Sequence, residues 1–118
     1  MNTSLINSII EEVTDGIYRD NPILLGKFGE SGRQKCKEDN GHHIKYLQTA
    51  ANMDEEKYFI DYAQWLNGIL TSRGMKTEHL IDNFKRLIIA FEKSSDDKHS
   101  RVFINMLESA IDSLSGEE

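Results

Sequence analysis

The chain has a single cysteine and a single proline, and it contains no long apolar run. One cysteine cannot form a disulfide within the chain, so the fold does not depend on an oxidising compartment. No apolar stretch reaches the ~18 residues of a membrane-spanning helix, and no signal-peptide pattern opens the sequence. We therefore expect a cytoplasmic protein that is neither inserted into a membrane nor directed to one.

The charge balance is acidic, with 20 Asp and Glu against 14 Lys and Arg and a formal net charge of −6. Duplex nucleic acids and anionic membranes select dense basic surfaces, so neither is expected as a partner. The 118 residues are enough for one modest core. We therefore expect one domain over residues 1–118.

Apolar residues recur at spacings of three and four, and no segment alternates as a strand would, which predicts an all-α fold. Thr3 or Ser4 should cap a first helix, and Asn21-Pro22 should end it, because proline disfavours helix at the residue before it. Residues 22–30 read as an irregular connector or a short turn of helix. A second long helix should run from about residue 31 to residue 52.

Three further helices are expected. Asp54 should cap the start of a third helix that ends near residue 73, and Gly74 should be its left-handed C-cap. Thr77 should cap a fourth helix, and residues 94–97 should form the turn and cap of a fifth. The apolar stripe expected on the third helix consists of Phe59, Tyr62, Leu66, Ile69 and Leu70, widened by Tyr58 and Trp65.

One segment, GRQKCKEDNGHHIKYL at residues 32–47, places polar chemistry on a helix whose packing needs only an apolar stripe. One helical face collects the residues Cys36, Asn40, His43, Ile44 and Leu47. Asp39 lies one turn from both Cys36 and His43, and Arg33, Lys35 and Lys37 flank this face. A thiol, a carboxylate and an imidazole that face a core need partners, and none is obvious locally.

Each of these residues also has an ordinary structural interpretation. A lone helical cysteine is commonly a small buried hydrophobe, and the charged run at residues 33–39 fits a solvated first turn. His42 and His43 cannot both face inward, since neighbours lie about 100° apart on a helix. A Cys–His pair can indicate nucleophilic catalysis, but the sequence places no third orienting group or oxyanion site, so we expect no enzyme.

In order and spacing, the chain resembles the phycobiliproteins, globin-related light-harvesting proteins that hold open-chain tetrapyrroles. The segments CKED, HHIKYLQTAANMD and ILTSRGMKTEHLIDNFKRLI carry the resemblance, which extends back through INSIIEEVTDGIYRDNP and forward to FINMLESAIDSL. Cys36 and Asp39 fall on the family's chromophore-bearing cysteine and on the aspartate three residues later. The Cys36 segment is also similar to domains attached to cobalamin-binding sensor proteins, which favours a sensory role over an antenna role.

The resemblance implies a globin-like fold that binds biliverdin or a related bilin as a light-absorbing, light-sensing photoreceptor module. Asp39 would accept hydrogen bonds from the pyrrole nitrogens and favour the protonated, red-absorbing chromophore. Cys36 would be the anchor of a thioether. Further contacts are expected from the histidines to a ring carbonyl or propionate, and from basic side chains to the propionates. The residues concerned are His42, His43, Arg33, Lys35 and Lys37, with pocket walls from Tyr46, Tyr58, Tyr62 and Trp65.

Two departures from the family bear on assembly. Glu38 stands where the family commonly has an arginine that pairs with a propionate, and the two N-terminal pairing helices of the family are missing. We therefore expect no antenna disc but a homodimer, whose signal would pass to a separate protein or through a change of association. Two alternatives remain open: a haem sensor with His42 or His43 as axial ligand, and a ligand-free globin-fold interaction module that acts through helical dimer contacts.

Overall fold

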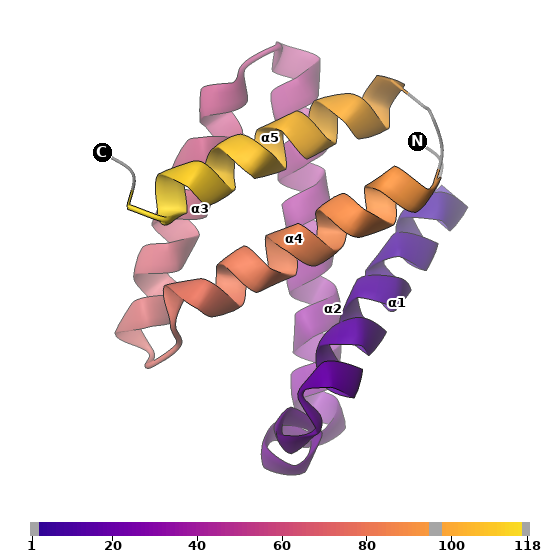
Figure 1. Cartoon of the computed structure of the whole chain (residues 1–118), viewed down its shortest axis with the longest axis vertical. Coiled ribbons are helices and arrows are strands. Elements are labelled where there is room, and N and C mark those ends of the chain that lie inside the picture. Colours follow the sequence, from indigo (N-terminus) through magenta and orange to yellow (C-terminus); the bar gives the residue numbers. More distant parts are fainter. Residues whose placement is uncertain (1–2, 95–97, 117–118) are drawn as a thin grey trace. The chain divides into compact units, whose positions relative to one another are not determined.

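The computed structural model describes residues 3–94 and 98–116, and all the regular structure among them is helical. The helices are α1 (Thr3–Asp20), α2 (Pro22–Met53), α3 (Glu56–Ser72), α4 (Thr77–Ser94) and α5 (Lys98–Leu114) (Figure 1). The expected all-α fold is confirmed for the described part of the chain. The turn and cap expected at residues 94–97 lie outside the described residues, apart from Ser94 at the end of α4.

The helices form two compact units, Met1–Lys45 and Tyr46–Glu118. The first unit contains α1 and most of α2, and the second contains the last turns of α2 together with α3, α4 and α5. None of the helices in the described part of the chain is both long and apolar enough to cross a membrane.

In the first unit, α1 ends where the sequence predicts. The Asn21 side-chain amide and backbone N–H both donate to the Ile17 carbonyl, at 2.8 and 3.0 Å. Pro22 then begins α2, which is interrupted at Gly29 by a φ of 65° and a ψ of −163°, a conformation that favours glycine. Residues 22–28 are thus a short piece of helix, and the helical segment that carries the polar face begins close to its expected start.

The helices of the first unit lie side by side and run in opposite directions (Figure 1). Ile9 and Val13 of α1 are buried. A Cβ added at Gly41 would lie 3.9 Å from Cδ1 of Ile10, an ordinary van der Waals distance, so Ile10 of α1 lies over α2 at this point. The contact brings one face of α1 against the segment that carries Cys36.

In the second unit, α4 and α5 pack against each other and α3 packs against both (Figure 1). Phenylalanine rings form the interior of this unit. Phe59 of α3 lies 5.5 Å from Phe84 of α4 between ring centroids, and Phe91 of α4 lies 5.4 Å from Phe103 of α5. These four rings are almost completely buried, which makes them the main apolar contribution to the unit.

The start of α3 differs from the expectation. Asp54 is not its N-cap; with a φ of 52°, it ends α2 instead. The backbone N–H groups of Asp54 and Glu55 donate to the carbonyls of Ala51 and Ala50, at 3.1 and 2.9 Å, in the pattern of a Schellman motif. Glu55, with extended backbone, is the residue that precedes α3.

The turn between α3 and α4 is partly as expected. Gly74 is confirmed as the left-handed C-cap of α3, with a φ of 91° and a bond from the Met75 N–H to the Leu70 carbonyl at 3.0 Å. Thr77 is the first helical residue of α4 and not its cap. The Lys76 N–H at this end instead donates to Nδ1 of the His79 side chain, at 3.2 Å, so a residue inside the first turn satisfies it.

Candidate functional site

The part of α2 that follows Gly29 carries the polar residues singled out in the sequence. Asn40 is completely buried, and its Nδ2 donates to the Cys36 carbonyl at 3.0 Å while lying 3.7 Å from Cys36 Sγ. His43, one turn further on, is 2% exposed, whereas His42 is exposed. The prediction that only one of the adjacent histidines faces inward is thus confirmed.

The Cys36 thiol is half-buried, and burial is the main reason why its pKa lies above the usual value. The buried Thr14 hydroxyl of α1 and the Asn40 amide lower this pKa, while the charge of Asp39 raises it further. Thr14 Oγ1 lies close enough to lower the pKa of the thiol, but it has no hydrogen-bond partner among the described residues. The site therefore combines a mainly protonated thiol with a buried hydroxyl that can still accept a polar partner.

His43 is held in its neutral form. Burial lowers its pKa to about 3, with a further contribution from the charge of His42. At neutral pH a neutral imidazole offers one N–H donor and one nitrogen acceptor. The buried end of the polar face thus presents hydrogen-bonding capacity without a charge.

Asp39 agrees better with the solvated interpretation of residues 33–39 than with a carboxylate that faces the core. Its side chain is 42% exposed, and its Oδ1 pairs with Lys35 Nζ at 3.3 Å. We expected no local partner for this carboxylate, and Lys35 provides one from the preceding turn of the same helix. Asp39 is therefore a carboxylate that already holds a cation at the edge of the polar face.

The other two basic residues of the segment bind carboxylates of α1. Arg33 pairs with Asp15 and lies 3.9 Å from Glu11, and Lys37 also pairs with Glu11. A hydrogen bond from Lys37 and the charges of Lys37 and Arg33 hold the pKa of Glu11 below its usual value. The three cations expected to meet ligand propionates thus each have a carboxylate of this chain as partner.

The expected aromatic walls belong to the second unit. Tyr46 stacks on Tyr62, with ring centroids 4.0 Å apart, and on Tyr58 at 5.6 Å. Tyr62 is buried and lies 6.4 Å from Trp65. The expectation that Trp65 widens the buried stripe of α3 is wrong, because this side chain is 61% exposed and lies beyond the edge of the stripe.

The predicted site residues therefore fall into two groups. Those in the first unit are Arg33, Lys35, Cys36, Lys37, Asp39, His42 and His43, and those in the second are Tyr46, Tyr58, Tyr62 and Trp65. The sequence reasoning missed the α1 residues Glu11, Thr14 and Asp15. A usable signal existed, because Glu11 and Asp15 have the same spacing of four as Arg33 and Lys37.

A comparison of the chain with protein-family models, curated proteins and solved structures finds no match. The indications of function therefore lie in the polar face of α2 itself. That face offers a sulfur atom, a carboxylate paired with a cation, and a neutral imidazole within two turns of one helix. Such a set can hold an extended ligand that has both polar and positively charged groups.

Proposed function

We propose that this chain binds a linear tetrapyrrole, biliverdin or a related bilin, as a light-absorbing and light-sensing module. One observation carries the proposal: a single helical segment presents a half-buried thiol at Cys36, a carboxylate at Asp39 and a neutral imidazole at His43. A bilin needs an anchor, an acceptor for its pyrrole N–H groups, and a hydrogen-bond partner for a ring carbonyl or propionate. The resemblance to phycobiliproteins supports the same assignment of these residues.

The donor set of the first unit fits this ligand. Asp39 already pairs with the cation Lys35, and a protonated tetrapyrrole is also a cation, so the carboxylate would exchange one positive partner for another. The buried Thr14 hydroxyl beside Cys36 would gain the partner that it lacks among the described residues. The proposal uses only residues of the first unit and does not depend on the tyrosines of the second.

The bilin supplies the absorption of visible light, and the protein residues supply position and charge. Asp39 would hold the pyrrole N–H groups and keep them protonated. His43 would donate to or accept from a polar group without adding a charge, since its pKa of about 3 keeps it neutral. Cys36 would anchor the ligand covalently, and its raised pKa predicts slow attachment at neutral pH. The signal would pass through a homodimer or to a separate protein.

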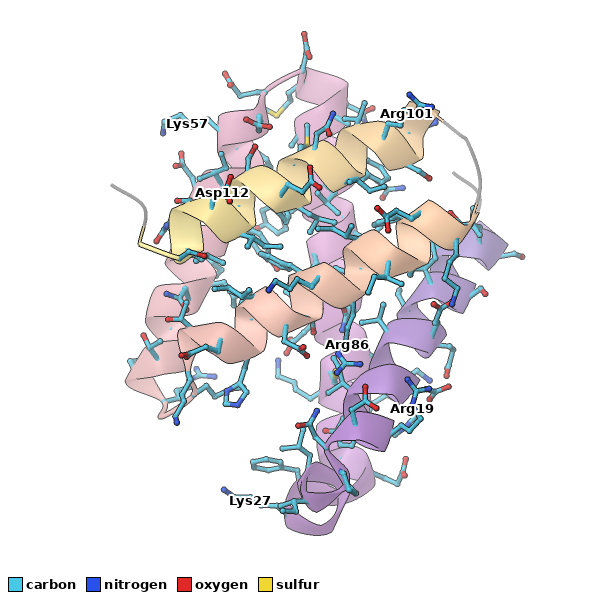
Figure 2. All side chains as sticks on the ribbon, viewed as in Figure 1. Arg19, Lys27, Lys57, Arg86, Arg101 and Asp112 are labelled. Carbon is cyan, nitrogen blue, oxygen red and sulfur yellow. The ribbon has the colours of Figure 1, made fainter. Side chains whose placement is uncertain are left out.

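Absorption titration of the purified protein with biliverdin, and separately with haemin, tests the proposal. We expect a saturable, red-shifted band with one bilin per chain, and zinc-dependent fluorescence on a denaturing gel if Cys36 forms a thioether. Asp112→Asn, an exposed acid of α5 labelled in Figure 2, is the matched control for Asp39→Asn.

A sharp Soret band with haemin alone would replace the proposal with a haem sensor that uses His42 or His43. No response to either pigment would leave the ligand-free interaction module as the better description. Both results would reject bilin binding.

A further inference from the structure

The ion pairs of the first unit raise a question about the proposed ligand. Its two propionates need cations, yet Arg33 and Lys37 already bind the α1 residues Asp15 and Glu11. Lys35 in turn pairs with Asp39. The basic residues nearest to Cys36 therefore enter the binding reaction with their charges engaged.

We infer that ligand propionates bind by exchange: they displace the carboxylates of Glu11 and Asp15 from Arg33 and Lys37 and thereby loosen α1 from α2. This inference rests on the proposed function, and it adds a way for the ligand to change the conformation of the protein. The carboxylates of α1 act as built-in competitors of the ligand carboxylates.

Charge favours exchange over simple addition. If two propionates were added to the existing ion pairs, four carboxylates would surround Arg33 and Lys37. Negative charges that share two cations at contact distance repel one another. The chain as a whole carries a formal net charge of −6, so its remaining charge does not attract an anionic ligand. Release of the α1 carboxylates restores one negative charge for each positive charge.

Burial indicates which partners would leave. The side chains of Arg33 and Lys37 are 23% and 29% exposed, whereas those of Glu11 and Asp15 are 49% and 54% exposed. The carboxylates can therefore rotate into water, while the cations stay on α2 with their stems packed. Exposed ion pairs contribute little to stability, so their exchange is accessible to a ligand that binds moderately well.

Exchange would loosen α1 without unfolding it. Ile10 of α1 still lies against Gly41 of α2, and Ile9 and Val13 remain buried. Only the ion pairs that Glu11 and Asp15, in the middle of α1, form with α2 would be lost. Coupling between the two kinds of binding is reciprocal. If the α1 carboxylates lower the affinity for the ligand, the bound ligand lowers their affinity for Arg33 and Lys37 by the same factor.

The test compares biliverdin with its dimethyl ester, whose propionates carry no charge, on the wild type and on Glu11→Gln/Asp15→Asn. The double variant should bind biliverdin about five- to twentyfold more tightly, the size expected for two lost exposed ion pairs. Its affinity for the ester should be unchanged. Glu108→Gln/Asp112→Asn, which neutralises two exposed acids of α5, is the charge-matched control and should bind both pigments like the wild type.

Hydrogen–deuterium exchange on the wild type gives a second readout that does not depend on the variant folding well. Biliverdin should speed amide exchange in α1 about two- to fivefold, and the ester should not. Equal biliverdin affinity of the wild type and a folded double variant, or α1 amides that biliverdin leaves unchanged or slows, would overturn the exchange while leaving bilin binding in place. Failure of both pigments to bind any of these proteins would remove the proposed function, and the exchange with it.

Discussion

Tyr46 and Tyr62 stack face to face, with ring centroids 4.0 Å apart and ring planes 12° from parallel. Tyr46 belongs to the last turns of α2 and Tyr62 to α3, so the stack joins the two helices across the turn at Asp54. Tyr58 also stacks on Tyr46, with ring centroids 5.6 Å apart and an interplanar angle of 22°. The three rings fix how α3 packs on the end of α2 within the second unit.

A double-mutant cycle measures the energy of this stack. Tyr46→Leu and Tyr62→Leu together should destabilise the protein by less than the sum of the single changes, with a coupling of about 0.5–1.5 kcal/mol. Urea unfolding of the four proteins gives this value. The pair Tyr46→Leu and Trp65→Leu serves as the comparison, and its effects should add. Additive effects for Tyr46 and Tyr62 would show that the stack contributes only buried area.

Substitution by alanine should change the stability in opposite directions at Gly74 and at Gly68. Gly74→Ala should cost about 1 kcal/mol, because Gly74 has a φ of 91° that an alanine adopts with strain. Gly68→Ala should raise stability by up to about 1 kcal/mol, since Gly68 lies inside α3 and an added Cβ meets no described atom within 4 Å. Thermal unfolding of both variants checks the pair, and equal effects would contradict the role of Gly74 as a C-cap.

The sequence predicted the helices well because their signals are local. Helical spacing of apolar residues, Pro22 and Gly74 all act within one turn of the chain, and the helix ends lie close to where these residues placed them. Asp54 was misplaced because a short polar side chain favours both an N-cap and a left-handed turn. When only two residues separate two helices, the sequence alone does not determine whether such a residue caps the second helix or forms the left-handed turn that ends the first.

The candidate site was harder to predict because its partners are not local. The spacing of Cys36, Asp39 and His43 was visible, and so was the need for only one inward histidine. The contacts of Arg33 and Lys37 with α1, and the burial of Thr14 beside Cys36, depend on how α1 lies along α2. The pair of Lys35 with Asp39 is the exception, since its spacing of four lies within one turn of α2.

His43 should make the stability depend on pH in a defined window. In the folded protein its pKa is about 3, below the value of 6.5 for an ordinary histidine, so the unfolded chain binds more protons between these values. The free energy of unfolding should therefore fall as the pH decreases below 6.5, by about 2 kcal/mol between pH 7 and 5. Above pH 7 this histidine should contribute no slope.

Urea unfolding at several pH values measures this dependence. His43→Gln should flatten the slope between about pH 5 and 7, whatever its effect on stability at a single pH. The adjacent exposed residue gives the control, since His42→Gln should retain the wild-type slope. A slope that survives in His43→Gln would assign the titration to another group.

Cys36 should react slowly with thiol reagents in the folded protein. Its half-buried position limits access, and its raised pKa reduces the thiolate fraction at neutral pH. We expect the rate of alkylation at pH 7.5 to be at least about tenfold below that of the denatured chain, and to rise through the alkaline range. Asn40→Ala should slow it further, because the Asn40 amide lowers the thiol pKa. Labelling as fast as in the denatured chain would exclude a buried thiol.

Asp39→Asn tests the proposal that this carboxylate sets the red absorption of a bound bilin. If Asp39 keeps the pyrroles protonated, the variant should bind biliverdin with a blue-shifted and weaker red band. Folding should be nearly unaffected, because the pair of Asp39 with Lys35 is exposed and such pairs contribute roughly 0–1 kcal/mol. Lys35→Gln separates the two partners: it removes the competing cation, so the red band should persist or strengthen. An unchanged spectrum in Asp39→Asn, or the same blue shift in Lys35→Gln, would show that the carboxylate does not set the protonation of the chromophore.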